Sequence, residues 1–219
     1  MATAKKNVRI EIRPPNFESV TLRLEGTAPL MTHKFSEKMR KQIEAKQTAT
    51  DATSKKREPK DYEQEYNAAR YVSARGWDGL PCAAIRAAMI AACRTVDGLP
   101  MTRAKGAFFI KADGRDAEDG TPIVRINGTP VHDTRPVRLE SGVADMRNRP
   151  RYDDWWVEVK IEYDADMLSA NDVGNLLGRA GMQVGLCELR PQGPNSYGGD
   201  FGMFTVKQAS AKGRIKAVA

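Results

Sequence analysis

The residues best suited to binding chemistry are three arginines at alternate positions in the stretch 147-RNRPRY-152. Arg147, Arg149 and Arg151 carry planar guanidinium groups, which donate paired hydrogen bonds to phosphate oxygens. Tyr152, directly after them, offers an aromatic ring on which a nucleobase can stack. This combination is typical of a site that binds a nucleic-acid strand. The simpler alternative is that the charges only keep an exposed loop soluble.

Two further basic segments add candidate phosphate contacts. In 33-HKFSEKMRK-41 the candidates are Lys34, Lys38, Arg40 and Lys41. A weaker version of the same pattern, 101-MTRAKG-106, contributes Arg103 and Lys105. Several such contacts would release counterions, so that affinity for a strand would fall steeply as salt rises. A plain solvated helix face explains the first segment equally well.

Two adjacent tryptophans follow the arginines. Because side chains alternate across a strand, Trp155 and Trp156 point to opposite faces. One of them belongs to the core. We expect the other to be Trp156, exposed enough to stack on a base or to contact a neighbouring subunit. Packing under a loop is the more common outcome for such a residue.

The stretch 196-SYGGDFGMFTV-206 clusters glycines directly before a strand-like FTV. The candidates are Gly198, Gly199 and Gly202. Glycine is entropically unfavourable in a strand, so its presence indicates a positive φ or a close backbone approach. A tight hairpin or bulge leading into the last strand is the favoured interpretation. The alternative, compatible with the first, is an open backbone surface that a phosphate or a neighbouring subunit approaches.

Groups for catalysis or metal binding are scattered. His33 and His132 are far apart, and neither lies at metal-ligand spacing from another histidine or cysteine. No GxSxG nucleophile motif occurs, and no glycine-rich dinucleotide or P-loop pattern stands between a strand and a helix. Three cysteines without CxxC spacing are typical of buried apolar residues rather than of a disulfide framework or a zinc site. We therefore expect no enzymatic activity, no cofactor and no metal.

The chain has 219 residues, of which 41% are hydrophobic, so residues 1–219 can form a single domain with a real core. Its net charge is +7, and the excess lies in residues 1–60, which hold 14 basic and 7 acidic groups. Such asymmetry indicates a polyanionic partner, most often nucleic acid. No apolar run approaches the ~18 residues that span a bilayer, and no signal-peptide core is present. We therefore expect a soluble, cytoplasmic protein without a membrane partner.

Periodicity places these residues on strands and helices. Apolar alternation predicts strands at 7–13, 19–26 and 154–164, and shorter ones are expected at 184–189 and 203–206. Apolar stripes and capping residues predict helices at 36–46, 61–70, 79–96 and 169–181. Residues 97–152 hold short strand candidates at 107–112, 122–126 and 137–140, which indicates irregular, partly projecting β structure rather than core. Residues 47–60 are expected to be a flexible loop and residues 207–219 a basic tail.

These elements follow one another as β-β-α, a loop, α-α, the β-rich segment, and then β-α-β-β. Without the segment at 97–152, this succession predicts an α+β fold in which an antiparallel sheet carries helices on one face. Such a split βαβ arrangement is the topology of the RNA-recognition-motif (ferredoxin-like) class. The pattern leaves the order of the strands within the sheet open.

Four motifs span much of the chain: 26-GTAPLMTHKFSEK-38, 79-GLPCAAIRAAMIAA-92, 145-DMRNRPRYDDWWVEVKIEYD-164, and 178-GRAGMQVGLCELRP-191 leading into GGDFGMFTV. In this order and spacing the chain resembles the Cas7-like (RAMP superfamily) backbone proteins of CRISPR effector complexes, including solitary relatives in phages and mobile elements. The resemblance implies a modified RNA-recognition-motif core with inserted finger, palm and thumb-like parts, in which 97–152 would be thumb-like. It also implies polymerisation along single-stranded RNA, with bases pried out at intervals.

The resulting hypothesis is a non-catalytic protein that binds single-stranded RNA or DNA and assembles into a helical filament or a multisubunit complex. Its partners would be the strand, copies of itself, and other CRISPR or phage proteins. The chain is short for a CRISPR subunit and no target-cleaving aspartate can be placed, so a stand-alone role is equally compatible. One alternative is a phage structural or interaction protein, such as an inhibitor that mimics a Cas7 subunit, without nucleic-acid binding of its own. Another is an endoribonuclease of related fold, with His33 or His132 near a glycine-rich loop.

Overall fold

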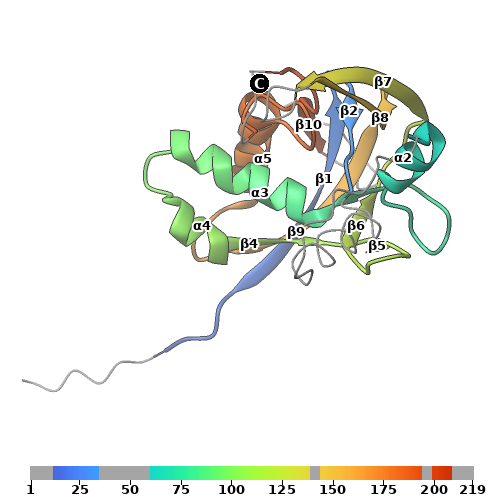
Figure 1. Ribbon diagram of the computed structural model, residues 1–219. Helices are drawn as coiled ribbons and strands as arrows, with labels where there is room; N and C mark the ends of the chain where they lie inside the picture. The colour runs from blue at the N-terminus through green and yellow to red at the C-terminus, as the bar shows by residue number, and fades with distance from the viewer. Residues whose placement is uncertain (1–11, 35–59, 139–143, 194–198, 209–219) are drawn as a thin grey trace, which may run out of the picture.

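The computed structural model of the chain describes residues 12–34, 60–138, 144–193 and 199–208 (Figure 1). Within these residues the protein is a mixed α+β structure with four α-helices and three small antiparallel sheets. The predicted helix at 36–46 lies outside the described residues, as do most of the predicted strand at 7–13, loop at 47–60 and tail at 207–219.

The largest sheet has four strands. They are β1 (Phe17–Gly26), β4 (Phe108–Lys111), β9 (Trp156–Asp164) and β10 (Phe204–Gln208). Their order is β10-β1-β9-β4, and every neighbouring pair is antiparallel. Alternate side chains of the two central strands face the core, and Leu24, Val157, Val159 and Ile161 are all fully buried. The strands predicted from alternation at 19–26 and 154–164 are thus confirmed, because one face of each is apolar.

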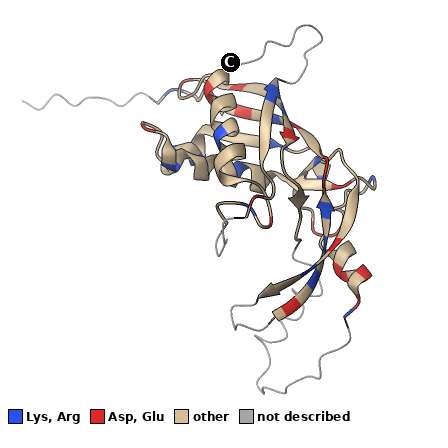
Figure 2. Ribbon diagram, turned by 90° about the horizontal axis from the view of Figure 1, so that it is seen from above, with Lys and Arg blue, Asp and Glu red and all other residues tan. Residues whose placement is uncertain are grey.

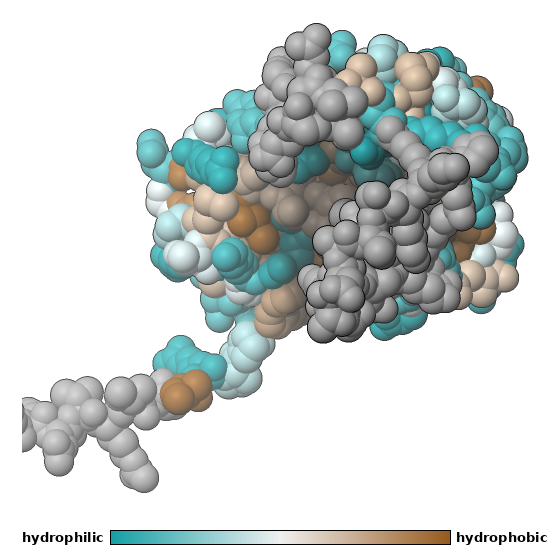
Figure 3. Space-filling model, viewed as in Figure 1, coloured by the Kyte–Doolittle hydropathy of each residue, from teal (hydrophilic) through white to brown (hydrophobic). Residues whose placement is uncertain are grey.

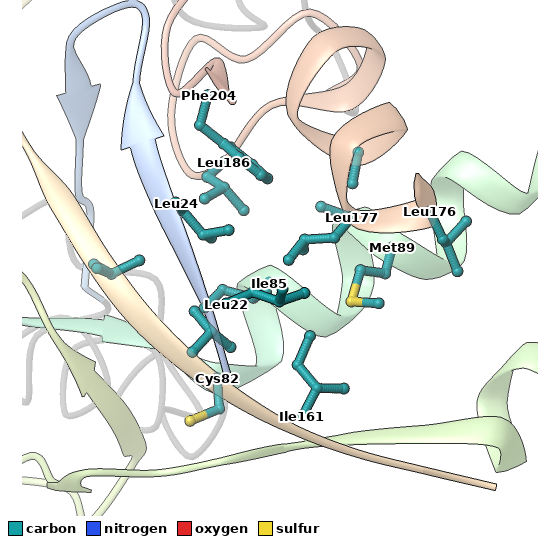
Figure 4. Close-up of a cluster of buried hydrophobic side chains, with 14 of the residues drawn as sticks. Leu22, Leu24, Cys82, Ile85, Met89, Ile161, Leu176, Leu177, Leu186 and Phe204 are labelled. Atoms are coloured by element: carbon teal, nitrogen blue, oxygen red, sulfur yellow. The ribbon is translucent and has the colours of Figure 1, made fainter. Parts of the chain in front are cut away.

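Two helices cover the apolar face of this sheet, namely α3 (Cys82–Ala92) and α5 (Ala170–Arg179). Figure 4 shows Leu22 and Leu24 of β1 in one cluster with Ile85 and Met89 of α3 and Leu176 and Leu177 of α5. Each of these side chains is at most 4% exposed. Burial of a leucine or isoleucine side chain stabilises the folded state by about 1.5–3 kcal/mol, so this cluster fixes both helices on the sheet.

Helix α5 begins as predicted, but the chain after it does not. Ser169 accepts a hydrogen bond from the Asp172 N–H, and the Asp172 carboxylate accepts one from the Ser169 N–H, which together form a capping box. The chain then continues into a π-helical turn at Ala180–Val184. The strand predicted at 184–189 is wrong, because Cys187 and Leu189 have positive φ angles of 61° and 56°.

A second, three-stranded sheet consists of β3 (Gly79–Pro81), β6 (Pro122–Arg125) and β5 (Gly114–Arg115). The predicted helix at 79–96 is therefore shorter than expected, since its first three residues pair with β6 instead. Pro81 directly precedes the first helical residue, and it has no N–H that would need a partner there. After Ala92 the helix passes into a short 3-10 turn at Cys93–Thr95.

The segment 97–152 is not a projecting insertion throughout. Its first part forms α4 (Met101–Ala107) and then β4, which is an edge strand of the central sheet. Ala104, Ala107 and Phe108 are completely buried. The prediction that this segment lies outside the core is therefore wrong up to Lys111 and also at β6, where Ile123 and Val124 are completely buried, because a four-residue strand gives no local signal of the sheet that it joins.

The third sheet carries the part of the chain that does extend away from the core. It consists of β2 (Leu30–Met31), β8 (Ala144–Tyr152) and β7 (Pro130–Arg138), in the order β2-β8-β7. Figure 2 shows β7 and β8 as a long two-stranded ribbon that leaves the central sheet, with α2 (Tyr62–Ala68) beside it. Helix α2 starts at the predicted cap, where the Asp61 carboxylate accepts a hydrogen bond from the Gln64 N–H at 3.0 Å.

Candidate nucleic-acid interface

The β7–β8 ribbon places the predicted arginines in a row. Side chains directly opposite in an antiparallel pair lie on the same face, and in this register Arg147 faces Arg135 while Arg149 faces Asp133. We define the arginine face as this side of the ribbon; its charged members are Asp133, Arg135, Asp145, Arg147, Arg149 and Arg151. The opposite face packs on α2, where the Asn148 side-chain amide donates to the Tyr62 carbonyl at 2.8 Å.

Every arginine of this face has a carboxylate partner. Arg151 reaches Asp133 and Asp153, both at 2.7 Å. Arg135 also pairs with Asp133, and Arg147 lies 3.3 Å from Asp145. The hydrogen bond from Arg135, opposed by burial and supported by Arg151, lowers the pKa of the Asp133 carboxyl. The side chains of Arg135, Arg147 and Arg151 nevertheless remain 33%, 30% and 32% exposed, so a ligand can reach them.

Arg149 has a different environment. Its side chain is only 9% exposed, and its Nη1 lies 2.6 Å from the Glu188 carboxylate on the loop that follows the π-helical turn. Glu188 also contacts the His33 ring at 3.3 Å, and its N–H donates to the Met31 carbonyl. Glu188 therefore ties the ribbon, strand β2 and this loop together. Arg149 is a structural residue of this link rather than an accessible phosphate contact.

The Glu188 link has a measurable pH signature. The hydrogen bond from His33, opposed by burial and reinforced by the Arg149 charge, lowers the pKa of Glu188 from 4.5 to about 2. The carboxylate therefore contributes stability that is complete above pH 4.5 and is lost as the pH falls towards 2. We expect Glu188→Gln to unfold at a lower temperature than the wild type at neutral pH, and its melting temperature to change less on acidification across this interval. Glu158→Gln, on an exposed carboxylate, is the control; equal acid sensitivity of all three proteins would contradict the prediction.

Two more of the predicted contact residues are buried. Tyr152 is 1% exposed and lies beside the ion pair of Arg70 and Asp78, and burial raises the pKa of its hydroxyl far above the usual range. Its ring is a core residue and not a platform for a base. The Lys34 side chain is 3% exposed and bonds to Asp116 and Glu118, so it is not available to a phosphate.

The remaining basic candidates do not join the arginine face. Lys38, Arg40 and Lys41 lie outside the described residues. Arg103 and Lys105 are exposed on α4, and Figures 1 and 2 place that helix at the end of the molecule away from α2 and the ribbon. The structure therefore does not assemble all the sequence candidates into one surface.

Trp156 lies at a second feature, next to the arginine face. It is half-buried at the start of β9, while Trp155 is only 4% exposed, so the predicted division of the two tryptophans is confirmed. The Arg23 guanidinium lies 3.9 Å from the centre of the Trp156 ring, a cation–π stack. The two side chains border a pocket of about 770 Å³, here called the tryptophan pocket. Its lining is Arg23, Glu25, Gly26, Asn127, Gly128, Thr129, Val131, Asp153, Asp154, Trp155 and Trp156.

The tryptophan pocket and the arginine face are continuous. Asp153 lines the pocket and also pairs with Arg151. Val131, another lining residue, lies directly opposite Arg151 in the β7–β8 register. A flexible strand can therefore pass from the row of guanidinium groups to the Trp156 ring without leaving the surface. Of the two predicted aromatic contacts, the structure leaves Trp156 partly accessible and buries Tyr152; the partly buried Phe201 ring also lies beside the arginines, 4.9 Å from the Arg135 guanidinium.

The described glycines support the tight-turn interpretation. Gly202 has a φ of +67°, and a Cβ there would lie 2.0 Å from the Leu186 carbonyl oxygen. At Gly199 a Cβ would lie 2.0 Å from the Leu189 carbonyl oxygen. Both glycines thus let the chain pack against its own backbone. Gly198 lies outside the described residues.

The charges of the described residues cancel. These ranges hold 22 basic and 22 acidic residues, so the whole net charge of +7 belongs to the other segments of the sequence. The face drawn in Figure 3 is largely hydrophilic, with apolar residues scattered over it. Electrostatic attraction from the described surface is therefore local, at groups such as Arg135, Arg147 and Arg151, rather than a broad positive field.

Both histidines have partners within the described part of the fold. His132 stacks on the Tyr66 ring at 3.7 Å and contacts the Asn148 amide at 3.0 Å, while His33 contacts Glu188.

Across the described ranges no group of three or more His, Cys, Asp or Glu side chains could hold a metal ion. Among the described helices, none has the length and apolar character needed to cross a membrane. Cys82 and Cys93 are buried free thiols, as predicted.

The geometry thus consists of a partly exposed row of paired arginines and an adjoining tryptophan pocket. Sequence reasoning found the arginines and Trp156, but it missed Arg23, Asp133 and Glu188, which hold or face them. No local pattern marks these three residues, since each meets its partner through strand pairing or through a distant loop. No protein-family model matches the chain, and no curated protein matches its sequence.

Proposed function

We propose that the protein binds single-stranded RNA or DNA without cleaving it. Phosphates lie on the arginine face, and a base stacks in the tryptophan pocket. The observation that carries the proposal is the continuity of the two features through Asp153, which puts guanidinium donors and an accessible aromatic ring on one surface. Guanidinium groups and stacking aromatic side chains are the two elements with which proteins hold single strands independently of sequence.

The paired carboxylates define how such binding works. A strand rises about 3.3 Å per residue, so Arg147 and Arg151, four residues apart, present two donors about 13 Å from each other along one direction, with Arg135 on the neighbouring strand. A phosphate must compete with Asp145 for Arg147, and with Asp133 and Asp153 for Arg151. The Asp153 carboxylate is exposed, and exposed pairs are worth only about 0–1 kcal/mol, so a phosphate can replace Asp153 at Arg151 with little loss of free energy. Binding is therefore moderate in strength and depends on salt.

We further propose that the central sheet with α3 and α5 is a core of the RNA-recognition-motif class. Along the chain its elements are β1, α3, β4, β9, α5 and β10, and the sheet order β10-β1-β9-β4 is the one expected for a split βαβ unit. Residues 112–155, between β4 and β9, would then be the thumb-like insertion that contains the arginine face. This supports the resemblance to Cas7-like backbone proteins, and with it the proposal that several copies line one strand.

The test is to titrate the protein into fluorescently labelled single-stranded RNA or DNA and to measure binding by fluorescence anisotropy at several salt concentrations. The double variant Arg147→Ala/Arg151→Ala should bind at least about tenfold more weakly, because each lost guanidinium removes charge-assisted hydrogen bonds. Its slope of log affinity against log salt should be smaller by about 1.4 for two lost phosphate contacts. Arg75→Ala/Arg94→Ala removes the same charge from two exposed arginines elsewhere and should bind like the wild type.

A single substitution with the opposite sign sharpens the test. Asp153→Asn removes a carboxylate that competes for Arg151, so it should strengthen binding of a strand. Wild-type protein that binds neither RNA nor DNA, or a double variant that binds as well as its control, would refute the proposal. The first of these results would favour the interaction-protein alternative, for which the neutral charge of the described residues is the supporting observation.

A further inference from the structure

We infer that the tryptophan pocket is a base-selective subsite, which prefers guanine and disfavours uracil and thymine. The inference rests on the proposed function, because it names which bases of a bound strand the pocket accepts. It adds a selectivity that the arginine face cannot supply, since contacts to phosphate carry no sequence information.

Trp156 and Arg23 together form the platform on which a base would stack. Arg23 lies over the Trp156 ring at 3.9 Å, and its Nε also lies 3.0 Å from the Glu25 carboxylate. The guanidinium plane is thus held from the ring side and from its own strand. Bases stack both on aromatic rings and on arginine planes, so a base extends a stack that is already formed. The pocket volume of about 770 Å³ gives room for a base with its sugar.

The pocket has more acidic than basic side chains in its lining. Its lining contains one guanidinium group, from Arg23, and three carboxylates, from Glu25, Asp153 and Asp154. Glu25 pairs with Arg23 and Lys207, and Asp153 pairs with Arg151, so within the described residues the unpaired negative charge of the lining is that of Asp154. Like charges close together repel. A phosphate is therefore disfavoured inside the pocket. The group that enters is the uncharged part of a nucleotide, with its phosphate left on the arginine face.

The hydrogen-bond acceptor available to a base in the pocket is the Asp154 carboxylate. Glu25 is engaged by Arg23 and Lys207, and Asp153 is engaged by Arg151. Asp154 makes no ion pair with any of the described residues, and it is exposed at the pocket rim directly before the two tryptophans. Gly128 lies against the Asp154 carbonyl, where a Cβ would approach to 2.6 Å, so the backbone that carries this carboxylate is closely packed.

The bases differ in the hydrogen-bond donors that they can offer to the Asp154 carboxylate. An ionised carboxylate only accepts hydrogen bonds. Guanine presents two adjacent donors, N1–H and the N2 amino group, which suit the two oxygens of Asp154. Cytosine and adenine each present one amino donor on the same edge. Uracil and thymine present one N3–H between two carbonyl oxygens, which the carboxylate repels. The expected order is therefore guanine, then cytosine and adenine, then uracil and thymine.

The experiment compares two labelled RNA strands of equal length by anisotropy at one salt concentration: oligouridine, and a strand in which isolated guanosines replace every third uridine. We expect the wild type to bind the guanosine-containing strand about tenfold more tightly. Asp154→Asn should reduce this ratio towards one without weakening oligouridine binding. Asp97→Asn, the same charge change at an exposed aspartate outside the pocket, should keep the wild-type ratio. Thermal melting verifies that each variant is folded.

The outcomes separate the two proposals. Equal affinity of the wild type for both strands, or a preference that survives in Asp154→Asn, overturns the base selectivity and leaves strand binding intact. Absence of binding to either strand overturns the proposed function, and the selectivity with it. Loss of affinity for both strands by the same factor in Arg147→Ala/Arg151→Ala supports the proposal that the arginine face contacts phosphates while the tryptophan pocket contacts a base.

Discussion

Replacing Lys34 by methionine is expected to lower the free energy of unfolding by about 3–5 kcal/mol, the usual cost of leaving a buried charge without its partner. The Lys34 and Asp116 side chains are 3% and 1% exposed. Burial lowers the pKa of the Lys34 ammonium, but the hydrogen bonds to Asp116 and Glu118 outweigh it and raise the pKa above its ordinary value. The Lys34 ammonium is therefore charged in the folded protein, and methionine would leave the buried Asp116 side chain without this partner.

The loss should be large because Asp116 organises a whole turn. Its carboxylate also accepts hydrogen bonds from the backbone N–H groups of Val72, Glu118 and Asp119 at 2.9–3.1 Å. Urea unfolding followed by circular dichroism measures the change. Lys111→Met is the control, since its pair with Glu162 is exposed and should cost no more than about 1 kcal/mol. Equal effects of the two substitutions would show that the buried pair does not hold this turn.

The two adjacent tryptophans should give opposite results when each is replaced by alanine. Trp155→Ala should destabilise the protein by about 3–5 kcal/mol, the range for removing a large buried aromatic side chain. Trp155 is 4% exposed, packs edge-on against Phe204 with ring centres 6.3 Å apart, and donates its Nε1–H to the Ala28 carbonyl at 2.8 Å. Gly26 lies against the same ring, because a Cβ there would come within 2.3 Å of it.

Trp156→Ala should instead leave the fold nearly unchanged and weaken strand binding by about 1–3 kcal/mol, the contribution of one stacked base. The half-buried Trp156 ring contacts Arg23 at the pocket and is not part of the core cluster. Urea unfolding and anisotropy, measured on both variants, separate the effects. Comparable losses of stability in both variants would place Trp156 in the core, and unchanged binding by Trp156→Ala would remove it from the interface.

The fold is predictable from the sequence where local pattern and burial agree. Alternation gave β1 and β9, because every second residue faces one apolar layer. The caps Asp61 and Ser169 gave the starts of α2 and α5, because their side chains bond to nearby backbone N–H groups. Residues 184–189 are mostly apolar, which predicts a short strand, yet Gly185, Cys187 and Leu189 adopt positive φ angles. There the packing of residues 186 and 189 against Gly202 and Gly199 decides the conformation, and no local pattern reports it.

The candidate site was predictable only in part, for a related reason. The arginine types and their spacing were visible at 147–151, but their partners are distant in sequence. Arg151 meets Asp133 across the ribbon, 18 residues away, and Arg149 meets Glu188, 39 residues away. These carboxylates convert one predicted phosphate contact, Arg149, into a structural link. They also make the remaining contacts exchangeable rather than free.

If the protein binds a strand as proposed, the neutral charge of the described residues implies that different parts of the chain set the association rate and the dissociation rate. The surplus of positive charge belongs to residues 1–11, 35–59 and 209–219, so in the proposed function the long-range attraction of a polyanion would originate in those segments. Residence time would depend instead on short-range contacts with the paired arginines and the indole of Trp156. Shortening the basic ends should therefore slow encounter while dissociation keeps its rate, a division that stopped-flow kinetics can resolve.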